Sequence, residues 1–163
     1  MSPILPTILR GSAAGLFGSL VQVAVGASES ALILPEHEDA NIAPRLMDRL
    51  SRDLGKEMPI EAEWLLGTLF HFGYGATWGI LYSLADEHLD LHPAAGGTAL
   101  GGLIYAITFP DWGGAVQTQV ERPPEVRTSR MTFVAASVAF TFGLATAYAS
   151  HAMKLRLRDR VGL

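Results

Sequence analysis

The chain has no cysteine among its 163 residues. Disulfides, thiolate metal sites, iron–sulfur clusters and cysteine nucleophiles are therefore excluded. Charged residues are scarce, at 17% of the sequence against about 25% in ordinary globular chains. The net charge of −4 provides no basic face, which argues against nucleic acid as a partner. The sequence also lacks a phosphate-binding glycine loop, a nucleophile elbow and a zinc-protease helix, and we predict no enzymatic activity.

Charges are missing from long segments of the chain. Residues 131–153 run for 23 positions without a charge, and 64–85 run for 22 in which only His71 can carry one near neutral pH. A helix that rises about 1.5 Å per residue needs roughly 20 apolar residues to cross a ~30 Å hydrocarbon layer. Two further apolar segments lie at 11–28 and 91–110. The sequence predicts an all-α protein, in which one integral-membrane domain over residues 1–163 forms a four-helix transmembrane bundle.

The predicted spans are separated by polar connections. The spans are expected at about 7–34, 61–85, 93–112 and 131–153. Residues 43–54 read as a short amphipathic helix, in which Arg45, Arg49 and Arg52 lie beside an apolar stripe. This pattern is typical of a helix at the headgroup level, and a solvated connector helix is the alternative. Residues 86–90 read as a short acidic turn.

Four spans place both termini on one side of the membrane. That side carries five basic residues and the opposite side carries seven, so the positive-inside rule does not decide the orientation. Lys154, Arg156 and Arg158 follow the last span directly, and we expect them to hold its end at the interface. This dense tail slightly favours termini inside. A cleaved signal at 11–26 is the alternative for the first span, but apolar character resumes at 31–34.

Small residues recur at four-residue spacing in the predicted spans. The pairs are Gly11–Gly15, Gly75–Gly79 and Gly97–Gly101, and Gly143 continues the pattern in the last span. Lipid provides no hydrophobic force that brings helices together, so close backbone approach through small residues takes that role. We predict that these glycines pack helices within the bundle, with a dimer face as the alternative.

Among the side chains that can ionise inside the predicted spans, we single out two. Glu29 is near the end of the first span and His71 is in the second. A carboxylate at the centre of a span costs roughly 2.5–3.5 kcal/mol, and less near its end. The functional hypothesis is a buried polar pair that faces the bundle interior. The alternatives are an interfacial Glu29 and a His71 that is hydrogen-bonded to a neighbouring helix.

The segment Glu36-His37-Glu38-Asp39 contains metal-binding residue types. It lacks the Glu-x-x-His pattern that carboxylate-bridged di-iron bundles present from two helices. A soluble acidic loop accounts for it. We therefore predict no metal site and no cofactor.

The first half of the chain carries three loose motifs. Gly11-Ser12-Ala13-Ala14-Gly15 opens a span with Glu29 near its end, Pro44-Arg45 begins a helix with Arg49, and the second span contains His71-Phe72-Gly73-Tyr74-Gly75. In these motifs the chain resembles the YagU-like group, uncharacterised bacterial inner-membrane proteins of unknown function. It departs from that group at Glu36-His37-Glu38, where a Pro-Pro-Arg run is expected. The resemblance implies a multi-pass location in the bacterial inner (cytoplasmic) membrane, and no reaction or substrate.

Three function hypotheses follow from these features. The preferred one is a non-enzymatic accessory or assembly subunit that packs against other integral membrane proteins or forms a homo-oligomer. The alternative is a small transporter or proton-linked permeability protein that uses Glu29 and His71. Transport proteins usually have several polar groups or broken helices at the middle of the membrane, and here only one or two such groups appear. A membrane-embedded enzyme is the third hypothesis, and no convergent catalytic set supports it.

Overall fold

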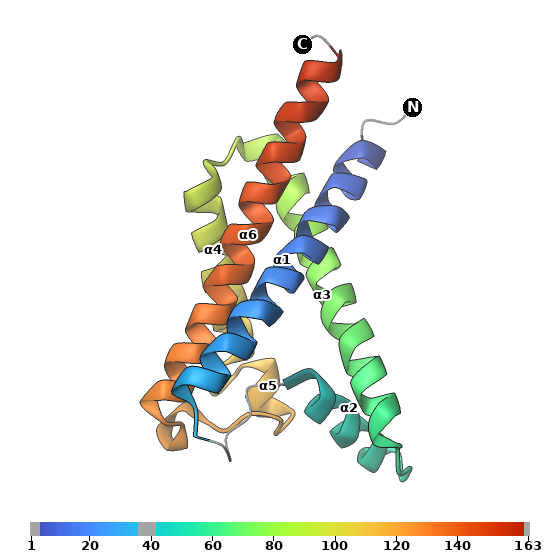
Figure 1. Ribbon diagram of the computed structural model, residues 1–163, viewed down its shortest axis with the longest axis vertical. Coiled ribbons are helices and arrows are strands. Elements are labelled where there is room, and N and C mark those ends of the chain that lie inside the picture. The colour runs from blue at the N-terminus through green and yellow to red at the C-terminus, as the bar shows by residue number, and fades with distance from the viewer. Residues whose placement is uncertain (1–3, 36–41, 162–163) are drawn as a thin grey trace.

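The computed structural model describes residues 4–35 and 42–161, with side chains through residue 157 (Figure 1). These residues form helices and contain no strand. The helices are α1 (Ile4–Ile33), α2 (Ile42–Asp53), α3 (Ile60–Leu89), α4 (Pro93–Thr108), α5 (Gly114–Gln117), the short 3-10 helix η1 (Pro124–Val126) and α6 (Ser129–Val161). The predicted all-α class is confirmed.

The long helices run between two ends of the molecule (Figure 1). The start of α1 and the end of α6 lie at the same end, and α2 and α5 lie at the other. Helix α1 packs against both α3 and α6, while α4 packs mainly against α6. We call the end with the start of α1 and the end of α6 the termini end, and the end with α2 and α5 the loop end.

Helix boundaries differ from the predicted segments in two informative places. Helix α3 continues through 86–89, where an acidic turn was expected, and ends at Asp90, which adopts a left-handed conformation with φ 45°. Helix α4 ends at Thr108 and not at 112. Pro110 has no backbone N–H to donate to the carbonyl oxygen of Ala106, which accepts from Trp112 Nε1 instead, and this explains the early stop.

Two helices are long and apolar enough to cross a membrane, α1 and residues Ser129–Leu157 of α6. The prediction had four such helices. Helix α4 has only 16 residues, about 24 Å at 1.5 Å per residue. Helix α3 has 30 residues, but glycines, threonines, aromatic residues and His71 lower its hydropathy. The arrangement with four spans therefore stays a prediction.

Helices α1 and α3 meet backbone to backbone at their glycines. A Cβ atom built on Gly11 would lie 2.6 Å from the Cα of Ile80, and one on Gly79 would lie 2.7 Å from the Cα of Gly15. A Cβ on Gly15 would lie 2.8 Å from the carbonyl carbon of Gly75. Real Cβ atoms do not approach this closely, so only glycine permits this contact.

Helices α4 and α6 use the same kind of contact. A Cβ on Gly97 would lie 2.8 Å from the Cα of Leu144, and one on Gly101 would lie 2.7 Å from the Cα of Phe140. A Cβ on Gly143 would lie 2.9 Å from the Cα of Gly101. The structure thus places all seven predicted packing glycines at contacts within one chain.

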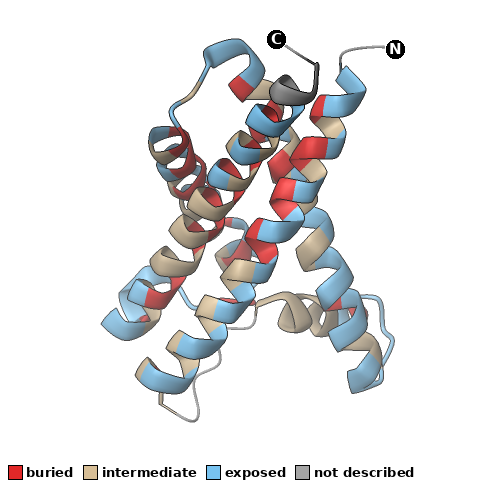
Figure 2. Cartoon of the chain, turned by 45° about the horizontal axis from the view of Figure 1, so that its top comes forward, coloured by how far each residue is buried: buried red, intermediate tan, exposed pale blue. Residues whose placement is uncertain are grey.

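Polarity is inverted relative to a water-soluble protein. The largest fully buried side chains are Val134, Thr146, Ser19, Ser83 and Ser150. Large apolar side chains cover the outside instead, and Leu9, Leu20, Leu65 and Leu69 are each more than half exposed. Figure 2 shows buried residues where the helices meet and exposed residues along their outer faces. An apolar surface of this extent is rare on soluble monomers.

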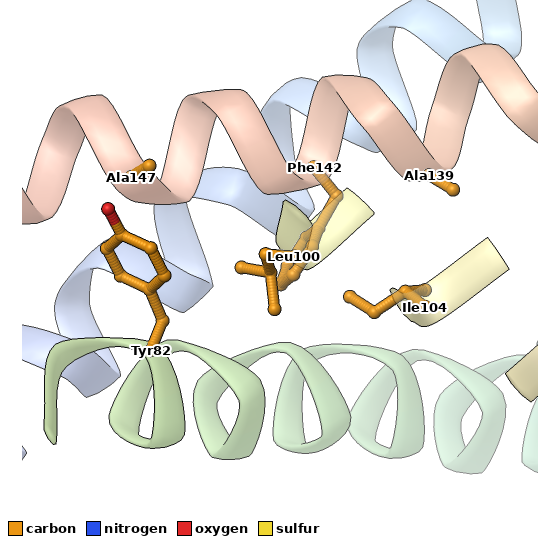
Figure 3. Close-up of a cluster of buried hydrophobic side chains, with 6 residues drawn as sticks. All are labelled: Tyr82, Leu100, Ile104, Ala139, Phe142 and Ala147. Atoms are coloured by element: carbon orange, nitrogen blue, oxygen red, sulfur yellow. The ribbon is translucent and has the colours of Figure 1, made fainter. Parts of the chain in front are cut away.

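A small apolar cluster joins three helices. Tyr82 of α3 points toward Ala147 of α6, and Leu100 and Ile104 of α4 lie on the same side of α6 as Phe142 and Ala139 (Figure 3). Alanine makes up a third of this cluster, so the helices approach closely here as well. The cluster ties α3 to the α4–α6 pair, and it also borders α1, since a Cβ on Gly18 would lie 3.2 Å from Phe142 Cδ2.

Candidate functional site

Three small-residue stripes each lead to a charged residue at the termini end. On α3 the stripe Gly75, Gly79 and Ser83 continues to Asp86, and on α6 the stripe Gly143, Ala147 and Ser150 continues to Lys154. On α1 the stripe Gly18 and Ala14 continues to Arg10. Residues three or four apart share one face of a helix, so each charge lies on the face that packs against the other helices.

These charges form a buried cluster that joins α1, α3 and α6. The Lys154 Nζ donates to Asp86 Oδ2 at 2.9 Å, and Arg10 Nη2 lies 3.8 Å from the same oxygen. Arg10 Nη1 pairs with Glu87 Oε1 at 2.7 Å. Arg10, Asp86 and Lys154 are only 5%, 3% and 7% exposed. We call Arg10, Asp86, Glu87 and Lys154 the charge cluster.

Hydrogen bonds extend the cluster into the bundle. Arg10 Nη2 donates to the carbonyl oxygen of Ser83 at 3.1 Å. The hydroxyl groups of Ser83 and Ser150 lie 2.9 Å apart and connect α3 to α6. On the outer side, Lys154 lies 3.7 Å from Asp90, whose side chain is 94% exposed. The connected polar groups thus extend from the solvent-exposed Asp90 to the buried pair of Ser83 and Ser150.

The four residues of the charge cluster balance, with two cations and two carboxylates, and the exposed Asp90 lies at the outer edge of the cluster. A balanced cluster has little attraction for an added anion or cation. The attraction within a buried ion pair offsets the free energy of desolvation only when the geometry is good. Removing one partner of such a pair strongly destabilises the fold. The arrangement therefore suits fixing three helices at one level better than binding a charged substrate.

A second set of charges closes the loop end. Arg127 Nη2 donates to the carbonyl oxygens of Phe109 at 3.0 Å and Arg122 at 2.7 Å, and the guanidinium lies over the Phe109 ring at 5.7 Å. Arg127 Nε lies 3.8 Å from Glu121, whose other oxygen lies 3.7 Å from Arg45 of α2. Because Arg45 is on α2, this contact ties α2 to the segment between α4 and α6.

The predicted interfacial basic residues have different surroundings. Arg49 pairs with Asp53 at 3.3 Å and Arg52 pairs with Asp48, both within α2; Arg49 is half-buried and Arg52 is exposed. Lys154 is buried in the charge cluster, and its place at the membrane interface stays a prediction. Arg156 is exposed, and the side chain of Arg158 lies outside the described residues.

The structure does not bring Glu29 and His71 together. The Ser137 hydroxyl of α6 donates to Glu29 Oε1 at 2.5 Å. His71 interacts with the backbone of Ser19, ten residues before Glu29 on α1, and its Nε2 has no hydrogen-bond partner among the residues that the structure describes. Ten residues span about 15 Å of helix. Both side chains are half-buried and face neighbouring helices, but they do not share a site.

No group of three or more His, Cys, Asp or Glu residues is positioned to hold a metal ion in 4–35 and 42–161. The predicted acidic segment Glu36-His37-Glu38-Asp39 lies outside the described residues.

Sequence reasoning placed the members of the charge cluster in separate surface features. Arg10 and Lys154 were counted as flanking basic residues, and Asp86 and Glu87 were assigned to a turn. The available signal was their spacing, because Asp86 and Lys154 follow the last small residue of their stripes by three or four positions. A stripe that packs helices predicts burial for the next residue on the same face.

Comparisons of the chain with known protein families, curated proteins and solved structures find no match. The fold and site define an all-α protein that has two helices able to cross a membrane by length and composition, and a buried charge cluster between three helices. The resemblance to the YagU-like group stays a prediction.

Proposed function

We propose that the chain is a multi-pass membrane protein in which α1, α3, α4 and α6 all cross the bilayer. The inverted polarity carries this proposal, because serines, threonines and charges are buried while leucines cover the outer faces of α1 and α3. In a bilayer, lipid covers such faces at no cost and the buried polar groups find partners inside. The family resemblance favours the bacterial inner membrane as the location.

Features of the loop end support the proposal that this end of the molecule lies at a membrane–water interface. Trp112 is 73% exposed there, and its Nε1 donates to the carbonyl oxygen of Ala106. Tryptophan is enriched at membrane–water interfaces. Helix α2 lies at this end and contacts α3, since a Cβ on Gly67 would lie 2.9 Å from the Pro44 nitrogen. We place α2 at the headgroup level on the side opposite the termini.

We infer that its role is a non-enzymatic accessory or assembly subunit. The face of α3 that α1 leaves uncovered includes Gly73 and Thr77, both exposed and four residues apart. A Cβ on Gly73 would meet no atom within 4 Å. Small residues at this spacing let a further transmembrane helix approach closely. This face favours docking of another membrane protein or a second copy of the chain.

Membrane fractionation followed by mild detergent extraction tests the proposal. The protein is expected to stay in the membrane fraction after carbonate washing and to elute in detergent with a stoichiometric partner or as an oligomer. Gly73→Leu is expected to remove that association while the protein remains folded, because its side chain occupies the docking face. Ala99→Leu, an enlargement at an exposed position of α4, is the matched control. Release by carbonate would refute the membrane location, and equal effects of the two variants would refute the docking face.

Proton-linked transport predicts a different result. The separation of Glu29 from His71 counts against a shared pathway, so Glu29→Gln is expected to leave proton flux into reconstituted vesicles unchanged. Glutamine retains an acceptor oxygen for Ser137, which preserves the contact between α1 and α6. Flux is measured with an entrapped pH indicator, and vesicles without protein provide the baseline. A flux above that baseline that Glu29→Gln abolishes would favour transport.

A further inference from the structure

We propose that a groove between α1 and α6 near the termini end binds one anionic phospholipid, with the phosphate group on Arg156. The groove has a volume of about 260 Å³ and is lined by Phe17, Ala149, Ala152, Met153 and Arg156. A lipid ligand requires a bilayer, so this inference rests on the proposed membrane location.

The shape of the groove suits an acyl chain. Ala149, Ala152 and Arg156 are three and four residues apart, so they follow one face of α6 over about 10 Å. The two alanines leave space beside the helix, and Phe17 of α1, which is half exposed, forms the opposite wall. The apolar lining residues of α6, Ala149, Ala152 and Met153, lie on the side of Arg156 toward the middle of the helix.

The positive charge of Arg156 favours a lipid with an anionic headgroup. Arg156 is exposed, and within the described part of the chain it has no ion-pair partner. Lys154, two residues earlier, is neutralised by Asp86, so Arg156 is the basic group available at the groove. A guanidinium binds phosphate oxygens through two parallel hydrogen bonds, and basic groups between transmembrane helices bind anionic headgroups. A lipid with net negative charge is therefore preferred over a zwitterionic one.

Native mass spectrometry of the full chain in detergent tests the inference, with phosphatidylglycerol and phosphatidylcholine as probes. We expect one phosphatidylglycerol molecule to bind about tenfold more tightly than phosphatidylcholine, since a charge-assisted contact of this kind is worth about a factor of ten or more. Arg156→Gln is expected to abolish that preference. Ala152→Phe, which fills the groove without changing charge, is expected to weaken both lipids.

Arg130→Gln is the matched control, because Arg130 is an exposed arginine at the loop end of α6. It is expected to leave the preference unchanged. Equal losses for Arg130→Gln and Arg156→Gln would overturn the site, as would unaltered binding in Ala152→Phe. If the protein still requires detergent, those results would refute only the lipid site and not the proposed membrane location. A protein that is monodisperse without detergent would overturn both proposals.

Discussion

Replacing Gly79 by leucine is expected to lower the free energy of unfolding in detergent by about 3 kcal/mol, at the upper end of typical overpacking costs. A Cβ at this position would lie 2.7 Å from the Cα of Gly15. The obstructing atoms belong to the backbone of α1, so no rotamer change relieves the clash and the two helices must separate. In lipid, that loss is not offset by a hydrophobic force between them. Titration with a denaturing detergent, followed by circular dichroism, measures the change.

Gly73→Leu is the matched control on the same helix. The chemical change is identical, but a Cβ on Gly73 meets no atom within 4 Å. Leucine is also a better helix former than glycine, by up to about 1 kcal/mol. This variant is expected to be as stable as the parent or slightly more so. Similar destabilisation by both substitutions would contradict the backbone contact between α1 and α3.

Asp86→Asn is expected to destabilise the bundle by about 3–5 kcal/mol, the cost of removing one partner from a buried ion pair. The asparagine keeps the shape of the side chain but leaves the buried ammonium of Lys154 with only the exposed Asp90, at 3.7 Å, as a countercharge. Arg10 retains Glu87 at 2.7 Å, so the loss falls mainly on Lys154. The same detergent titration measures it.

Two further variants isolate the buried charge. Asp90→Asn removes the exposed partner of the same lysine and suits the left-handed backbone there, so a loss of about 1 kcal/mol or less is expected. Adding Lys154→Met to Asp86→Asn is expected to restore part of the stability, because the unpaired charge is then gone. Two results would show that the cluster does not hold α6 to α3. One is a double variant that is no more stable than Asp86→Asn alone, and the other is an equal loss of stability for Asp86→Asn and Asp90→Asn.

The glycine contacts were predictable from the sequence, and their partners were not. Gly11, Gly15, Gly75 and Gly79 stand out because four-residue spacing places them on one face of a helix. Spacing describes one helix at a time. Nothing in it indicates that the α1 stripe meets the α3 stripe or that Gly143 meets Gly101, since lipid treats all apolar faces alike.

The charge cluster shows the same limit more sharply. Arg10 contacts a residue 73 positions away, and Lys154 contacts one 68 positions away. In the sequence each of these residues flanks an apolar run, where a basic or acidic residue usually lies at the interface. Their burial depends on how α1, α3 and α6 pack together, and the small residues on the facing sides of these helices decide how closely they approach.

The sequence by itself determined the all-α class, the approximate extent of the long helices and the faces on which they pack, because helical periodicity and charge distribution are local properties of the chain. The tertiary structure alone decided that Glu29 pairs with Ser137 and not with His71, and that Lys154 turns inward to Asp86. Those outcomes depend on which backbones approach closely enough to exclude a side chain. That choice is a property of several helices together, and no single segment of the chain encodes it.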